Sequence, residues 1–303
     1  MPQPDTVGSI DFGILAATWS PDESLLALIT GTHSTGATNE DYDGGLGDNK
    51  LMLMTSTFDV LSEASFHTEE YGEGIDKLRG PRLQAVFNPT LTDAPINVGW
   101  GSKQTQFHGS LGKAAAQAAT NLDNIGSSPD DDETPRISWR GDGAYFVVSA
   151  LSAKNSQSGL RRRVLRVYNR DAALQSTSEP VAGLEHTLSW RPSGNLITST
   201  QRFGFEGGGA GKDGRHDVVF FERNGLRHGE FNLREPWEKI TLGGRISWGY
   251  SVKDVSWSSD SNILSVWIRE REKDVGSLRV SRSFILRTHS STVQLWTTGN
   301  YHW

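Results

Sequence analysis

A pattern of alternating apolar and polar residues recurs four times along the chain. Its clearest copy is LEHTLSWRPSGNLI, residues 184–197. Apolar and polar side chains alternate up to Trp190, a polar turn with proline and glycine follows, and Leu196 begins a second apolar run. This order is typical of two antiparallel strands joined by a tight hairpin. The other three copies contain Trp19, Trp139 and Trp257.

Each copy is followed by a third apolar run and in most cases by a fourth. After Trp190 these runs are HDVVFFE, residues 216–222, and LRHGEFNL, residues 226–233. Four strands per unit, with an aromatic residue near the end of the first and third, indicate the blade of a WD-type β-propeller. We therefore predict an all-β fold, a partial propeller with four to five blades. The predicted core tryptophans are Trp19, Trp139, Trp190 and Trp257.

The pattern divides the chain into a single propeller array with three irregular segments. The predicted blades cover residues 11–67, 135–183, 184–235 and 252–303. Residues 68–134 form an irregular insertion that contains an alanine-rich helix at 112–122 and a turn with an acidic linker at 124–135. Whether this insertion also holds a full blade stays open. Residues 236–251 and 276–291 do not fit the blade pattern, and we interpret them as insertions or as translated intron sequence.

The composition excludes several classes of protein. The 303 residues carry a net charge of −6, so the chain as a whole is not a basic nucleic-acid binder. There is no cysteine, which excludes disulfides and thiolate metal sites. The start of the chain has no signal-peptide pattern, and no apolar run approaches the length of a membrane span. We expect no membrane contact and a cytoplasmic location, with the nucleus as a second location.

No motif predicts a catalytic, metal-binding or cofactor-binding residue. The glycine-rich stretch 204–214 satisfies G-x-G-x-x-G, but it leads into a strand, whereas a dinucleotide loop must open a helix. The eight histidines lack metal-ligand spacing, and no G-x-S-x-G motif occurs. His186 precedes a first strand and is expected to be a hydrogen-bonded structural histidine of its blade.

One dense basic cluster stands out, at Arg161, Arg162, Arg163 and Arg166. One interpretation is a charged strand at the edge of a blade, which discourages pairing with other chains. The other is an electrostatic contact with RNA or with an acidic partner, to which Lys103 is added as a further candidate. Both interpretations place these side chains at the surface.

Several long segments together resemble one family, the largest subunit of the Elongator complex. They are residues 95–110, 179–197, 218–235 and 294–303. The resemblance implies a non-catalytic scaffold with WD-type propellers, a helical repeat region and a C-terminal part through which it homodimerises. The complex modifies the wobble uridine of certain tRNAs at carbon 5, and another subunit supplies the chemistry and its cofactors. Expected partners are therefore the other Elongator subunits, including the catalytic one, and tRNA through the whole complex.

The resemblance also implies that this chain is a piece of a larger ring. Earlier blades, a second propeller and the helical repeats have no counterpart here, and the tRNA-contacting stretch of the family lies outside this chain. Two alternatives stay open: a generic WD adaptor of another complex, and a propeller enzyme. An enzyme of that kind would need His, Asp or Glu on several inner strands, where this chain has mainly Thr, Ser, Ala and Leu.

Overall fold

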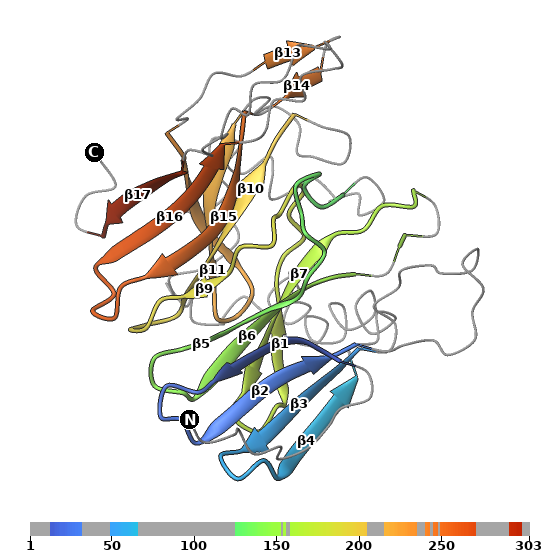
Figure 1. The fold of residues 1–303 in the computed structure, drawn as a ribbon, viewed down its shortest axis with the longest axis vertical. Helices are drawn as coiled ribbons and strands as arrows, with labels where there is room; N and C mark the ends of the chain where they lie inside the picture. The colour runs from blue at the N-terminus through green and yellow to red at the C-terminus, as the bar shows by residue number, and fades with distance from the viewer. Residues whose placement is uncertain are drawn as a thin grey trace, which may run out of the picture.

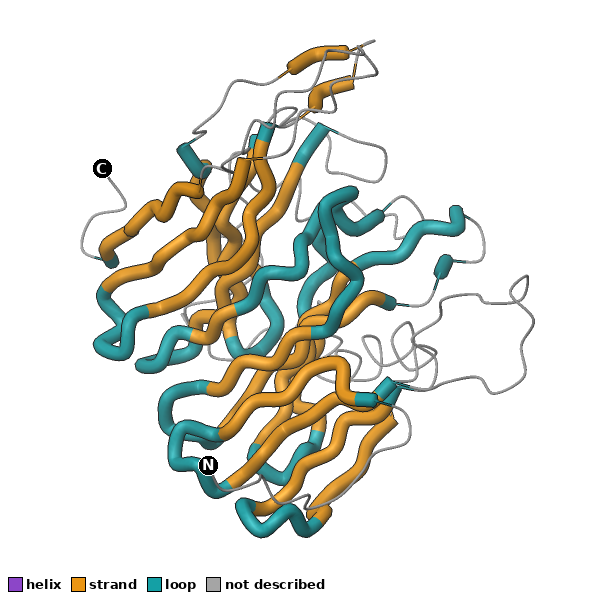
Figure 2. Tube along the Cα trace, viewed as in Figure 1, coloured by secondary structure: helices purple, strands orange, loops and turns teal. Residues whose placement is uncertain are grey.

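The structure is a computed structural model in which every regular element is a β-strand (Figure 1). It describes residues 13–31, 49–65, 125–152, 154–155, 158–204, 215–234, 240–242, 245–247, 249–270 and 291–298. Within these ranges Figure 2 shows strands and loops, with no helix. In the same ranges no helix has the length and apolarity needed to cross a membrane.

Apart from one two-stranded hairpin, the described strands form four antiparallel sheets, each in simple sequence order. The first sheet contains β1 (Ile14–Trp19), β2 (Leu25–Thr30), β3 (Lys50–Thr55) and β4 (Val60–Ser65). The second contains β5 (Arg136–Trp139), β6 (Tyr145–Leu151), β7 (Arg163–Asn169) and β8 (Leu174–Thr177). The third contains β9 (Ser189–Trp190), β10 (Leu196–Arg202), β11 (His216–Glu222) and β12 (Arg227–Asn232). The fourth contains β15 (Tyr250–Trp257), β16 (Ile263–Glu270) and β17 (Ser291–Thr297).

The sheets follow one another around an arc, with their first strands adjacent (Figure 1). Strand β1 contacts β5, β5 contacts β9, and β9 contacts β15. The second and third sheets pack both faces on their neighbours, because successive side chains of a strand point to opposite faces. In β6, Phe146 and Val148 pack toward the first sheet, whereas Val147 packs toward the third. This arrangement confirms the predicted all-β propeller fold.

A hydrogen bond that recurs between neighbouring first strands explains why serine precedes tryptophan in the repeated pattern. The Ser138 hydroxyl accepts a hydrogen bond from the backbone N–H of Trp190 at 2.8 Å. One blade further on, the Ser189 hydroxyl accepts from the backbone N–H of Trp257 at 3.3 Å. Ser138 and Ser189, each directly before a tryptophan, therefore satisfy a backbone donor of the next blade, as buried donors require.

The turn after each tryptophan also repeats in its backbone geometry. The fourth residue after the tryptophan has a positive φ, +67° at Gly143 and +107° at Gly194. Glycine adopts this left-handed conformation without a steric penalty. At the equivalent position of the first and fourth sheets, Glu23 and Ser261 have φ of +56° and +64°. The hairpin geometry is therefore kept in all four copies, including the two that lack glycine.

Three of the four predicted core tryptophans are buried. Trp190 exposes 2% of its surface, and Trp139 and Trp257 are also buried, each between two sheets. Trp19 differs, because 40% of its surface is exposed. It lies in the first sheet, which has a neighbour on one face only among the described residues.

Some boundaries differ from those expected from the sequence. Residues 184–188 make an isolated bridge and single backbone bonds in place of the predicted continuous strand. Strand β15 begins at Tyr250, two residues before the predicted blade boundary, and a separate hairpin of β13 (Ile240–Leu242) and β14 (Arg245–Ser247) precedes it. The predicted helix at 112–122, the glycine-rich stretch 205–214 and the last predicted strand lie outside the described residues. The proposed blade limits stay predictions.

The free faces of the first and fourth sheets expose apolar side chains. In the fourth sheet Trp267 pairs with Val293, so both point to one face, and Trp267 is 44% exposed. Leu295 and Ile263 are exposed on the same sheet. In a propeller these faces are covered by neighbouring blades, since one blade cannot bury its apolar faces alone.

We expect Trp190→Ala to lower the free energy of unfolding by about 3–5 kcal/mol, because it leaves a large cavity between two sheets. Trp267→Ala is the matched control and should lower it by only about 1 kcal/mol, since that ring is half exposed. Denaturant unfolding followed by circular dichroism at low protein concentration measures both. Equal losses would contradict the packing described here.

We expect the 303-residue chain alone to self-associate through the exposed apolar face of the fourth sheet. Val293→Lys combined with Leu295→Lys should shift it toward the monomer, since both side chains are exposed and the substitution adds charge without disturbing the core. Size-exclusion chromatography with light scattering reports the mass. A native chain that is monomeric and unfolds cooperatively would refute this expectation.

Candidate functional site at the junction of two sheets

The polar centre of the described structure is built on residues 126–135, which we call the acidic segment. It runs between the second and third sheets and is held by backbone hydrogen bonds to both. The N–H of Ser127 donates to the carbonyl of Arg161 at 2.7 Å, and the N–H of Gly183 donates to the carbonyl of Gly126 at 2.7 Å. The sequence predicted a linker here, whereas the structure makes these residues a bridge between two blades.

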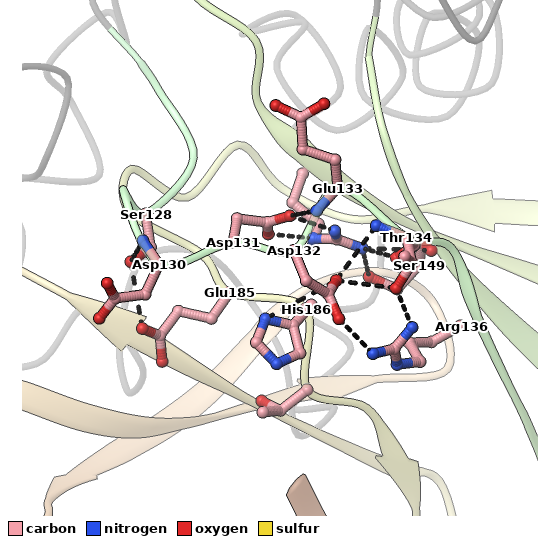
Figure 3. Close-up of polar contacts among 12 residues, drawn as sticks. Ser128, Asp130, Asp131, Asp132, Glu133, Thr134, Arg136, Ser149, Glu185 and His186 are labelled. Atoms are coloured by element: carbon pink, nitrogen blue, oxygen red, sulfur yellow. Dashed lines mark hydrogen bonds and ion pairs between the residues drawn. The ribbon is translucent and has the colours of Figure 1, made fainter. Parts of the chain in front are cut away.

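Four consecutive acidic residues of this segment, which Figure 3 labels, face four different arginines. The pairs are Asp130 with Arg202, Asp131 with Arg163, Asp132 with Arg136, and Glu133 with Arg161. The arginines come from β5, β7, the residues before β7, and β10. The acidic segment therefore neutralises cations from both sheets at once.

The pair of Arg163 and Asp131 is the most enclosed of the four. Their side chains are 0% and 2% exposed. Nε and Nη2 of Arg163 donate to the two carboxylate oxygens at 2.5 Å each, which is the bidentate geometry. Nη1 donates to the carbonyl of Thr134 at 3.1 Å and to the hydroxyl of Ser149 at 3.3 Å. An ion pair is tolerated in the interior when hydrogen bonds offset the cost of removing both charges from water. Arg163 and Asp131 meet this condition, because most of their polar groups have hydrogen-bond partners.

A second buried carboxylate, Glu185, lies beside the first group. Its Oε2 contacts Nε2 of His216 at 2.6 Å and accepts from the hydroxyl of Thr200 at 2.5 Å, and its Oε1 accepts from the hydroxyl of Ser128 at 3.1 Å. Burial raises the pKa of Glu185, but His216, Arg202 and the hydrogen bonds outweigh it and hold that pKa well below its ordinary value. The carboxylate is therefore held in its ionised form.

Asp132 joins Arg136 and His186 where Figure 3 shows the acidic segment meeting β5. Burial raises the pKa of Asp132, but the Thr134 hydrogen bond and the charges of His186 and Arg136 lower it overall. Nδ1 of His186 lies 3.9 Å from Oδ1 of Asp132, too far for a hydrogen bond. The expected hydrogen bond of His186 is thus not formed at Nδ1, and the buried histidine with a short contact to a carboxylate is His216.

This arrangement stabilises charge and does not favour proton transfer. A general acid or base works best with a pKa near the operating pH. Both Asp132 and Glu185 have pKa values shifted away from that range. Among the described residues no three His, Asp or Glu side chains are grouped so as to hold a metal ion. The chemical role of the site is to join two blades through buried charge pairs.

The basic cluster predicted from the sequence is divided by the structure. Arg163 and Arg166 are each 1% exposed, because β7 is paired on both edges and both of its faces are covered. Burial lowers the pKa of Arg166 to about 9, although Tyr168 partly opposes this. These two arginines are therefore neither a charged blade edge nor a surface for RNA. Arg161 and Arg162 lie before β7 and are partly buried, and Lys103 lies outside the described residues.

Sequence reasoning missed the acidic segment as a site. The signal was present, since four acidic residues stand in a row at 130–133 and the chain has several arginines downstream. Such a run is usually solvated. Only the packing of two sheets brings four arginines to it.

Antiparallel sheets of up to four strands, packed face to face with adjoining first strands, define the class of this protein as a β-propeller. A family model described as the first N-terminal β-propeller of ELP1 matches residues 2–303. The chain belongs to this family.

Similar proteins carry the same family name. Elongator complex protein 1 of Mus musculus is 39% identical over 301 residues, which cover 99% of this chain and 17% of the relative. The protein of that name from Saccharomyces cerevisiae is 32% identical over 325 residues, with 99% of this chain and 19% of the relative covered. A putative elongator complex protein 1 of Xenopus laevis is 46% identical over 206 residues, 68% of this chain and 14% of the relative. The chain spans less than a fifth of the length of these relatives.

We expect Arg163→Ala to lower the free energy of unfolding by about 3–5 kcal/mol, because it leaves the Asp131 carboxylate buried and unpaired. Lys50→Ala is the control. It removes the exposed pair with Glu63 and should change stability by about 0–1 kcal/mol. The double variant Arg163→Met with Asp131→Leu should recover most of the loss, since it buries no charge. Equal denaturant midpoints for Arg163→Ala and Lys50→Ala would contradict the assignment.

We expect stability to fall as the pH drops below the ordinary glutamate pKa of 4.5. The folded-state pKa of Glu185 is depressed, so its contribution is fully present above the unfolded-state pKa and is lost as the pH falls toward the folded-state value. Denaturant unfolding between about pH 6 and pH 3 measures this dependence. Glu185→Gln should make the free energy of unfolding depend less on pH. An unchanged slope would show that Glu185 is not the group responsible for the dependence.

Proposed function

We propose that this chain is a non-catalytic scaffold part of the Elongator complex, which supports modification of the tRNA wobble uridine at carbon 5. The observation that carries the proposal is the family match over residues 2–303. The relatives named Elongator complex protein 1, which the chain matches over 99% of its own length in mouse and yeast, support it. The propeller fold suits the role, since its rigid blades offer several surfaces to partners.

The site supports a scaffold role through its chemistry. Asp130 and Asp131 are paired with arginines, and Glu185 is held in its ionised form, which stabilises the contact between two blades. In this proposal the radical and acetyl-transfer chemistry belongs to another subunit, and no cofactor is assigned to this chain. The alternatives from the sequence, an adaptor of another complex and a propeller enzyme, are outcomes of the test below.

The proposed partners are the other Elongator subunits, the catalytic one among them, and tRNA through the assembled complex. The net charge of −6 gives this chain no overall attraction for tRNA. Homodimerisation is assigned to parts of the longer protein that this chain does not contain. The proposed location is the cytoplasm, with the nucleus as a second compartment.

The test uses cells that lack their own copy of the gene and express the tagged full-length protein. We expect the other Elongator subunits to co-purify and the wobble-uridine modification, measured by mass spectrometry of tRNA, to be restored. Arg163→Ala should reduce both in parallel with protein stability, whereas Lys50→Ala should leave both unchanged. A different set of partners with no effect on tRNA would support the adaptor and overturn the proposal.

A further inference from the structure

A hollow of about 430 Å³ opens beside the acidic segment, where the chain enters β7. Its walls come from the acidic segment, from the end of β6 and from the loop that joins β6 to β7. The lining residues that matter here are Ser127, Glu133, Lys154 and Arg161. Two of them are cations and one is an anion, so the hollow carries a net positive charge.

Arg161 differs from Arg163 in its hydrogen bonding. Its side chain is 12% exposed, and its Nε and Nη2 are buried without a hydrogen-bond partner among the described residues. Its pair with Glu133 joins Nη1 and Oε2 at 3.7 Å, which exceeds hydrogen-bond distance. A guanidinium is always charged and offers five donors, so donors left unpaired in a buried setting are costly.

Arg163, two residues further on, shows what partner this environment favours. There a carboxylate meets the guanidinium in two parallel hydrogen bonds of 2.5 Å. The planar fork of arginine matches a carboxylate in this way. Glu133 does not reach the same geometry at Arg161, since its side chain is 70% exposed and its backbone φ is +59°. A carboxylate from outside the chain that enters the hollow can accept two hydrogen bonds from the Arg161 guanidinium when that side chain rotates.

The charge around the hollow favours a single carboxylate over a nucleic-acid backbone. Nucleic acid is held by several cations that neutralise successive phosphates. The described walls offer two cations, Lys154 and Arg161, and one anion, Glu133. Two cations can hold one carboxylate, but they cannot neutralise a run of phosphates.

We propose that this hollow binds an aspartate or glutamate side chain of a neighbouring subunit, with Arg161 as its partner and Lys154 beside it. This inference rests on the proposed function, since it requires that the chain works within a multi-subunit assembly. The acidic residue docks one protein segment at the junction of the second and third sheets.

The test is carbodiimide cross-linking of the purified full-length protein with its co-purifying subunits. This reagent joins a lysine amine directly to a carboxylate in contact with it, and mass spectrometry identifies the joined peptides. We expect Lys154 to be linked to an aspartate or glutamate of another subunit. Arg161→Gln should abolish that link, and Arg161→Lys should keep part of it. The matched control Arg162→Gln should leave the link intact, because Arg162 does not line the hollow.

Thermal melting of each variant shows whether the propeller is still folded. A link from Lys154 to Glu133 only, in a complex whose subunits still co-purify, would overturn this inference and leave the proposed function standing. Cross-links from this hollow to RNA under ultraviolet light, without a link to protein, would also overturn it. If no other Elongator subunit co-purified, the proposed function and this inference would both be overturned.

Discussion

The structure depends on the pairing of four consecutive carboxylates with four arginines at the junction of two sheets. Moving a single charge out of water costs several kcal/mol, so the two enclosed members of the run, Asp130 and Asp131, are tolerated there because each meets a cation. Asp131 and Arg163 show the condition most fully met, with both side chains out of solvent and two parallel hydrogen bonds. Because the cations come from both sheets, the pairing fixes how one blade sits on the next.

The same junction joins the repeated and the irregular parts of the chain. The blades repeat a strand, a turn of fixed backbone geometry and a serine that bonds to the next blade, as at Ser138 and Trp190. The acidic segment is irregular, but it packs where the repeat alone would leave arginines of β7 and β10 buried and uncompensated. Its conformation is therefore set by the charges that it meets.

The charges of the site also hold their own side chains in place. Asp132 and Glu185 are hydrogen-bonded, lie beside cations and keep low pKa values. Arg161, whose contact with Glu133 is too long for a hydrogen bond, lines the hollow beside the acidic segment. Two of its donors have no hydrogen-bond partner among the described residues.

The sequence by itself determined the strands and the propeller class, because alternation, turn residues and the tryptophan repeat are local signals. It placed Trp139, Trp190 and Trp257 in the first strands, and these residues are buried between sheets. Tertiary structure alone decided the site. Residues 130–133 look like a solvated linker, and Arg163 and Arg166 look like a basic surface, until packing buries both arginines and pairs Arg163 with Asp131. Burial depends on both neighbours of a blade, and a pattern read along one strand carries no information about either of them.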